Sequence, residues 1–401
     1  MALWTRYLLV FWWPLVVGMG AVYGLRESRS RTAELLTTTP QPAWRRAALP
    51  AGAMALALAS GFGLLILVGG VQVALGATTY LPLGWLPISL VAALALVAGA
   101  VFGMGVARAV PSVLTPPALT VFLLLTSLLL RQANDGALPW SIPPNRFALL
   151  SPATAEPREM LLTLSNSVHL GQTLWLLGLL ATGLALLSAA TRRARLLAVA
   201  PVLAGAALAL LNLPGAPRDA YVVDKAAATV VCDGPVCVTQ ANRSRLPELA
   251  PRGTEALRVL HNTLGHPRKL SGNVVLIDFD DPLIAHATGT ELTRLLVAQG
   301  LAPNCAPRTP WEGGGQVDIP AQSIAASWAL GDHQLEPLQQ PDTDARPQAA
   351  RPQRASANAE VAWKKLTALP PAEQRSRIAQ AHAAALSCKN ALAALTGETS
   401  P

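Results

Sequence analysis

RESRSRTAELLTTTPQPAWRR, residues 26 to 46, is an arginine-rich stretch that separates two long apolar stretches of the chain. It carries five arginines, two of which close it as Arg45 and Arg46. Loops that remain in the cytoplasm are enriched in Lys and Arg, whereas loops on the other side of the membrane are depleted in both. The stretch is therefore predicted to be a cytoplasmic loop between two membrane-spanning helices, and it sets the orientation of the other spans.

Two parts of this loop carry further information. The segment Ser30 to Leu36 is predicted to form a short helix, because Glu34 falls in its first turn and prolines follow it. The ring of Trp44 and the guanidinium groups of Arg45 and Arg46 are expected at the lipid headgroups, where such side chains anchor helices. Two roles remain open for the loop: an interfacial anchor that only fixes topology, or a docking surface for a soluble partner.

Six apolar stretches are predicted to cross the membrane as helices, because about 20 apolar residues span the hydrocarbon core. Their predicted bounds are 7–25, 49–75, 85–106, 110–130, 169–190 and 196–213. With the loop at 26–46 inside, nine arginines fall in predicted inner loops and four in outer ones. This bias is the one expected for a membrane protein, and it leaves the chain after the sixth span outside.

Local features refine the prediction in four places. Arg6, at the edge of the first span, is expected to extend along the helix and keep its charge at the interface. Pro116 and Pro117 are expected to kink the fourth span near its inner end. The apolar run from Met160 to Leu164 is expected to lie in the outer interface as short helical structure. In the second span, small residues including Gly61 are expected to permit close helix contact.

The composition supports a membrane protein and argues against nucleic acid as a partner. Hydrophobic residues make up 52% of the chain and charged residues 13%, with a mean hydropathy of +0.38. Residues 1–214 hold thirteen Arg, no Lys and five acidic residues, whereas residues 215–401 hold eighteen basic and eighteen acidic residues. The net charge of +8 therefore belongs to the membrane half, where a basic excess serves topology.

Residues 215–401 are predicted to form a small extracytoplasmic α/β domain. Strands are expected over 221–237, with a turn at Asp233 to Pro235, and over 273–279; helices are expected over 244–261, 288–300 and 371–395. The segment 339–359 is rich in Pro, Gln, Arg and Asp and is expected to be a flexible insertion.

All four cysteines lie in this second half, and an even number there suits disulfides in an oxidising compartment. The predicted turn brings Cys232 and Cys237 together, so these two are expected to pair. The pairing of Cys305 with Cys388 would close a long loop and contribute about 4 kcal/mol in the chain-entropy treatment. Four free thiols are the alternative, and zinc is disfavoured because no second close pair of Cys or His accompanies them.

The sequence lacks the motifs of several enzyme classes. It has no G-x-x-x-x-G-K-[ST], H-E-x-x-H or G-x-S-x-G motif. The two histidines of HNTLGH (261–266) lack a nearby carboxylate, and the acidic residues of DFDD (278–281) are better explained as a solvated strand end than as a Ca²⁺ site. The chain is therefore predicted not to be an enzyme and to hold no metal or cofactor. Because its spans hold almost no ionisable residue, any transport energy is expected to come from another chain.

Two stretches resemble one family of membrane proteins. RESRSRTAELLTTTPQPAWRR resembles the inner-loop signature of ABC-2-type permeases, in which an arginine-rich segment of the form R..T.ELL.TTP....WRR precedes a membrane helix. VVCDGPVCVTQANRSRLPEL, residues 230–249, resembles the domain that follows the membrane helices in a bacterial subfamily of these permeases. Members usually carry one more helix at the N-terminus, starting inside, so the resemblance implies either that a helix precedes Met1 in the full protein or that the chain is a divergent member.

The resemblance implies a function and partners. It implies a membrane-spanning permease subunit of an ABC exporter in a bacterial plasma membrane, contacting lipid, a second permease subunit and a cytosolic ATPase subunit. It assigns contact with the ATPase to the inner loop, at Arg29, Arg31, Thr32, Glu34, Leu35 and Leu36. The alternative is a membrane-anchored sensor or binding protein whose outer domain binds a ligand or a partner.

Overall fold

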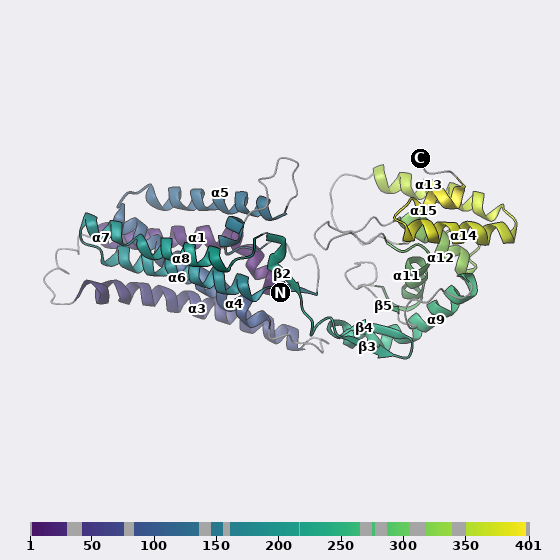
Figure 1. The fold of residues 1–401 in the computed structure, drawn as a ribbon, viewed down its shortest axis with the longest axis horizontal. Coiled ribbons are helices and arrows are strands. Elements are labelled where there is room, and N and C mark those ends of the chain that lie inside the picture. Colours follow the sequence, from purple (N-terminus) through teal and green to yellow (C-terminus); the bar gives the residue numbers. More distant parts are fainter. Residues whose placement is uncertain are drawn as a thin grey trace. The chain divides into compact units, whose positions relative to one another are not determined.

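The computed structural model describes residues 2–29, 42–75, 84–135, 146–154, 161–215, 217–264, 275–276, 287–304, 318–338 and 350–397. The chain divides into two compact units, Met1–Asp224 and Lys225–Pro401 (Figure 1). The division falls after Asp224 and not after Pro214, because the strand β2 (Tyr221–Val223) pairs with a strand of the first unit.

The first unit is a bundle of long apolar helices. Its helices are α1 (Ala2–Arg29), α3 (Ala43–Leu75), α4 (Trp85–Ala109), α5 (Thr115–Asp135), α6 (Asn166–Ser188), α7 (Arg192–Leu197) and α8 (Ala200–Asn212). Five helical stretches are long and apolar enough to cross a membrane: Leu3–Arg26, Trp44–Leu75, Trp85–Ala109, Asn166–Ser188 and Arg192–Asn212. The chain is thus a helical protein with five candidate membrane spans in its described part.

The predicted fourth span, 110–130, differs from the structure at its start. The residues between Ala109 and Thr115 are not helical, and the apolar part of α5 is the shorter stretch Thr115–Arg131. Pro116 and Pro117 therefore lie in the first turn of α5 and do not kink a helix interior. Proline is tolerated there because the first-turn amides have no acceptor within the helix. The predicted kink was wrong for this reason.

Helices α1, α4, α6 and α8 pack through glycines that let their backbones touch. A Cβ atom at Gly24 of α1 would lie 2.5 Å from the Met104 carbonyl oxygen of α4, and one at Gly183 of α6 would lie 2.6 Å from the Val101 carbonyl oxygen. By contrast, a Cβ atom at Gly61 of α3 would meet nothing within 4 Å. Close helix contact therefore occurs around α4 and not at Gly61, where it was expected.

The last membrane stretch is interrupted between α7 and α8, at Ala198 and Val199. The first amides of α8 have no acceptor within their own helix, and unmet backbone groups are costly away from water. The hydroxyl of Thr182 on α6 accepts a hydrogen bond from the Val202 amide at 2.9 Å. A side chain of the neighbouring helix thus satisfies one amide at the start of α8.

A two-stranded sheet lies in the first unit beside the helices. The strand β1 (Leu162–Leu164) pairs antiparallel with β2, in the register Leu162 to Val223 and Leu164 to Tyr221. The run 160–164 was expected to be helical at the interface, and this was wrong from Leu162 on. Pairing with β2 gives the backbone N–H and C=O groups of β1 hydrogen-bond partners, which a three-residue helix would not supply.

The second unit is chiefly helical, with a small sheet. Its described strands are β3 (Val230–Asp233), β4 (Val236–Thr239) and β5 (Val275–Leu276); β3 and β4 form an antiparallel hairpin and β5 runs parallel to β4. Its helices are α9 (Leu246–Leu264), α11 (Gly289–Leu301), α12 (Ile319–Leu330), α13 (Ala350–Thr367), α14 (Pro371–Leu386) and α15 (Ala391–Thr396). This unit was predicted to be a small α/β domain, but its described part holds more helix and less strand than that class implies.

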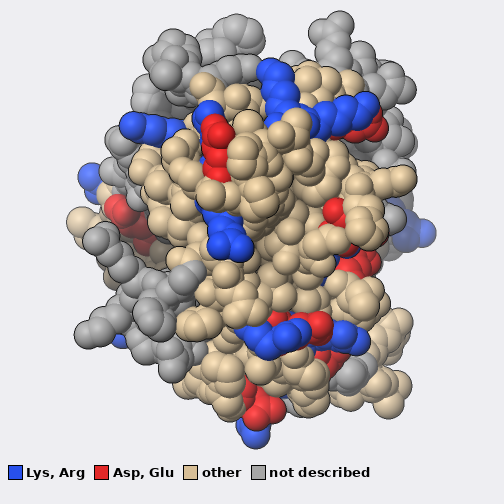
Figure 2. Space-filling model, turned by 90° about the vertical axis from the view of Figure 1, so that its right-hand side faces the viewer, with Lys and Arg blue, Asp and Glu red and all other residues tan. Residues whose placement is uncertain are grey.

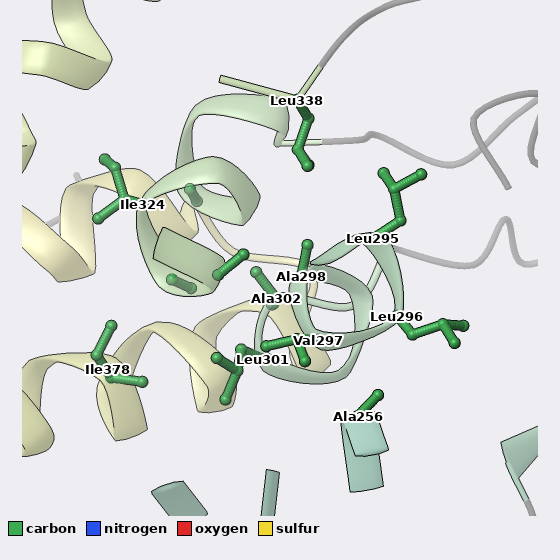
Figure 3. Close-up of a cluster of buried hydrophobic side chains, with 14 of the residues drawn as sticks. Ala256, Leu295, Leu296, Val297, Ala298, Leu301, Ala302, Ile324, Leu338 and Ile378 are labelled. Carbon is green, nitrogen blue, oxygen red and sulfur yellow. The ribbon is translucent and has the colours of Figure 1, made fainter. Parts of the chain in front are cut away.

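The core of the second unit forms around α11 (Figure 3). Leu301 of α11 is fully buried, and Ile324 of α12 and Ile378 of α14 belong to the same apolar cluster. Ala256 of α9 joins the cluster from another helix. Helices that are far apart in the sequence thus share one core, which explains how a unit with little sheet is held together.

Two expectations for the C-terminal region were wrong. Helix α13 begins at Ala350, within the predicted flexible insertion 339–359, and Ala359 is buried; the rest of that insertion lies outside the described residues. The predicted helix 371–395 is broken into α14 and α15 by a turn in which Cys388 has a φ of 55°. The polar composition of 339–359 indicated a flexible segment. However, Ala, Arg and Gln are all good helix formers, so a polar segment that contains them can begin a helix.

Acidic and basic side chains are interspersed on the surface of the second unit (Figure 2). Several pair locally along helices, such as Arg245 with Glu248 and Arg252 with Glu255. Such exposed pairs stabilise a fold little, but a surface of mixed sign suits contact with water.

Candidate functional site

The predicted partner-binding loop lies mostly outside the described residues. Arg29 is the last residue of α1, whereas Arg31, Thr32, Glu34, Leu35 and Leu36 fall in the part that the structure does not describe. Trp44, Arg45 and Arg46 begin α3, where the Arg45 guanidinium lies 5.2 Å from the centre of the exposed Trp44 ring. The role of these side chains as interface anchors and the docking role of the loop both stay predictions.

Arginines gather at one end of the first unit, which we call the basic end. Helices α1 and α4 run parallel, since Trp13 contacts Ala95 while Gly24 contacts Met104. Helix α7 follows at the same end, because the Arg195 guanidinium donates a hydrogen bond to the Ala109 carbonyl oxygen at 2.9 Å. The arginines of the basic end are Arg26, Arg29, Arg45, Arg46, Arg108, Arg192, Arg193 and Arg195.

The opposite end holds one arginine that is fully buried. Arg6 of α1 has 0% of its surface exposed, so it does not extend to an interface as expected. Its Nε donates a hydrogen bond to the Pro152 carbonyl oxygen at 2.8 Å, and its Nη2 donates one to Gln172 Oε1. A charge inside an apolar span is costly and is retained where it has a purpose, so Arg6 marks a candidate site.

Gln172 of α6 organises the acceptors around this arginine. Its side chain is 2% exposed, and its Nε2 donates hydrogen bonds to the carbonyl oxygens of Leu149 and Ser151, at 3.0 Å each. Leu149 belongs to the short helix η1 (Arg146–Leu150). Arg6 and Gln172 thus fasten the segment after η1 between α1 and α6.

Three polar side-chain atoms in this region have no hydrogen-bond partner among the described residues. They are Arg6 Nη1, Thr154 Oγ1 and His169 Nδ1. The Thr154 amide donates to the Arg6 carbonyl oxygen at 3.4 Å, and His169 lies one helical turn before Gln172 on the same face of α6. Arg6 lies within electrostatic range of both His169 and Tyr221 of β2. We call Arg6, Thr154, His169 and Gln172 the Arg6 cluster.

The guanidinium group of another arginine, Arg131, is stabilised in a different way. Arg131 of α5 donates a hydrogen bond to the Tyr7 hydroxyl at 2.7 Å, and its guanidinium lies 4.4 Å from the centre of the Tyr7 ring. A hydroxyl and an aromatic face together stabilise a cation at the edge of an apolar region. Arg6 has no such ring contact among the described residues.

The second unit contains the predicted hairpin disulfide. Cys232 and Cys237 are bonded to each other, with their Cα atoms 4.0 Å apart across the β3–β4 ladder. This confirms the first predicted pair. Cys388 is also disulfide-bonded, but its predicted partner Cys305 lies outside the described residues.

The predicted alternatives for a metal site fall largely outside the described residues. His261 lies in the last turn of α9, whereas His266 and the acidic residues of 278–281 are among those not described. Within the described ranges, no group of three or more His, Cys, Asp or Glu side chains is placed to hold a metal ion.

One signal for the Arg6 cluster is visible in the amino-acid sequence. His169 and Gln172 stand near the start of an otherwise apolar span, three residues apart and therefore on one face of a helix.

Comparison of the chain with protein-family models, with curated proteins and with solved structures finds no match.

Proposed function

We propose that this chain is the membrane-spanning permease subunit of an ABC-type exporter, energised by a separate cytosolic ATPase subunit. The observation that carries the proposal is the stretch 26–46, which resembles the inner-loop signature of ABC-2-type permeases and joins two helices long enough to cross a membrane. The chain itself has no P-loop motif, so the ATPase must be another protein.

The placement of charge supports one orientation. The loop leaves α1 at Arg29 and enters α3 beside Arg45, both at the basic end. Under the positive-inside bias, that end faces the cytoplasm, where an ATPase is accessible. The Arg6 cluster then faces the outer side. The disulfide in the second unit suits an oxidising compartment, which supports a second unit on the outer side of the plasma membrane.

Purification of the tagged chain from its native membranes tests the coupling. The wild-type chain is expected to copurify with a protein that carries a P-loop ATPase motif, identified by mass spectrometry. Replacement of Glu34, Leu35 and Leu36 by Ala is expected to abolish this association, because the triple variant removes the compact, partly apolar patch of the loop. Insertion in the membrane is expected to be unchanged.

The connector between α4 and α5 offers a matched control. Val113 and Leu114 are 70% and 72% exposed at the basic end, and their replacement by Ala removes a similar apolar area. This double variant should retain the ATPase. If no P-loop protein accompanies the wild-type chain, or if the triple variant retains one as well as the control does, the permease assignment is wrong. A membrane-anchored binding protein would then be the better reading.

A further inference from the structure

The Arg6 guanidinium is a buried positive charge without a negative partner in the described structure. It forms no ion pair with the described residues, and its two hydrogen bonds go to neutral oxygens of Pro152 and Gln172. Neutral acceptors satisfy the hydrogen-bonding capacity of a guanidinium only in part and do not cancel its charge. An uncompensated charge in such surroundings costs several kcal/mol, so a counter-charge at this position would stabilise the fold.

The groups around Arg6 suit an anion better than a cation. Within the part of the chain that the structure describes, Arg6 Nη1 is a donor without an acceptor, and the hydroxyl of Thr154 and Nδ1 of His169 are also without partners. A hydroxyl donates readily, and an imidazole nitrogen donates in the matching tautomer. The acceptors of this region already accept hydrogen bonds. Gln172 Oε1 and the Pro152 carbonyl oxygen accept from Arg6, and the Leu149 carbonyl oxygen accepts from Gln172 Nε2.

The burial of the cluster limits the size of its ligand. Arg6 is 0% exposed, Thr154 6% and His169 9%, so a bulky phosphate headgroup would have to displace protein to reach them. A halide ion or the carboxylate group of a small molecule is compact, carries one negative charge and accepts several hydrogen bonds. Hydrogen bonds from a charged donor to such a group are about twice as strong as neutral ones.

We propose that the Arg6 cluster is a binding site for a small monovalent anion, either a halide or a carboxylate, held by Arg6 Nη1 with Thr154 and His169. The anion neutralises the buried guanidinium between α1 and α6. This site does not depend on the chain being a transporter subunit. It is formed by residues that lie far apart in the sequence, in α1, in α6 and in the segment after η1.

Thermal unfolding of the purified full chain in detergent tests the site. The Tm is measured at constant ionic strength while a bulky sulfonate salt is replaced stepwise by sodium chloride, and in a second series by sodium acetate. A ligand that binds the folded state alone raises the Tm with a saturating dependence on its concentration. We expect saturation in one or both series. Chloride identifies a halide site, and acetate alone identifies a site for a carboxylate-bearing ligand.

Two variants and one control assign the effect to the cluster. Arg6→Gln is expected to lose the anion-dependent rise in Tm. Gln172→Glu is expected to lose it as well, because its carboxylate reaches the same guanidinium. Arg146→Gln removes an exposed arginine of η1, whose Nη1 lies 3.5 Å from the Leu210 carbonyl oxygen, and should leave the rise unchanged.

Three results would overturn the proposal. One is a wild-type Tm that rises without saturation, or does not rise, in both series. Another is an anion dependence that Gln172→Glu retains in full. The third is a loss of the dependence in Arg146→Gln equal to that in the cluster variants. If Arg6→Gln does not fold, the wild-type series and Gln172→Glu still decide the question.

Discussion

Arg6 of α1 donates a hydrogen bond from Nη2 to Oε1 of Gln172 on α6, across 166 positions of the sequence. Both side chains are buried, and Gln172 in turn holds the carbonyl oxygens of Leu149 and Ser151. One amide side chain thus connects α1, α6 and the segment from Leu149 to Ser151.

Replacement of Gln172 by Leu is expected to destabilise the first unit by about 2 to 4 kcal/mol, because it leaves a buried guanidinium nitrogen and two carbonyl oxygens unpaired. A clear fall in Tm of the detergent-purified chain would report the loss. Ser167→Ala on the exposed face of α6 is the control, since Ser167 bonds only to the neighbouring Ser165 hydroxyl at 2.9 Å. Equal Tm values for the two variants would show that the contact is not important.

Replacement of Gly103 by Ala is expected to destabilise the bundle by about 1 to 3 kcal/mol, because a Cβ atom there would collide with the backbone of Val17 on α1. In Gly61→Ala on α3, the new methyl group meets nothing within 4 Å. That variant should keep or slightly raise the Tm, since Ala favours a helix over Gly. Opposite signs for the two substitutions are therefore expected, and a Gly103→Ala chain as stable as the wild type would refute the α1–α4 packing.

Asp318 is expected to be important for the second unit, because its carboxylate caps two helices. Oδ1 accepts from the Ala321 amide of α12 at 3.1 Å, and Oδ2 accepts from the Leu392 amide of α15 at 3.0 Å. At about 1 kcal/mol per cap, Asp318→Ala should lower the free energy of unfolding by about 2 kcal/mol. Glu255→Ala, which removes an exposed pair with Arg252, should change it by less than about 0.5 kcal/mol. Chemical denaturation followed by Trp fluorescence compares the two variants.

The cysteines of the second unit are expected to be fully oxidised. Peptide mapping without reductant should show Cys232 bonded to Cys237 and Cys388 bonded to Cys305, and replacing the first pair by Ser should cost about 2 kcal/mol in the chain-entropy treatment. Free thiols at all four positions in protein from its native membrane would contradict the placement of this unit outside the cytoplasm.

The sequence was most informative where a single physical constraint dominates. The length of the hydrocarbon core requires long apolar helices, and the stretches from Trp85 to Ala109 and from Asn166 to Ser188 follow from that requirement. The hairpin pair Cys232–Cys237 followed from the turn between two β-rich runs. These features depend on local sequence, so no knowledge of distant contacts was needed.

Features that depend on tertiary partners were missed. A lone arginine at the edge of an apolar span is expected to extend outward, and only the positions of Pro152 and Gln172 explain why Arg6 turns inward. Helix α13 was hidden for a similar reason. Its first residues are polar, but Ala359 and Leu366 pack into the core that α11 and α12 build. In each case the deciding interaction joins residues far apart in the chain.

The orientation of the two ends of the bundle is the central claim, and cysteine labelling tests it directly. In a chain whose native cysteines are disulfide-bonded, Ala2→Cys places a thiol at the start of α1, and Ser112→Cys places an exposed one at the basic end. A membrane-impermeant thiol reagent added to intact cells should label Ala2→Cys at once and Ser112→Cys only after the cells are opened. The reverse pattern, with Ser112→Cys labelled and Ala2→Cys shielded, would contradict the orientation of the whole bundle.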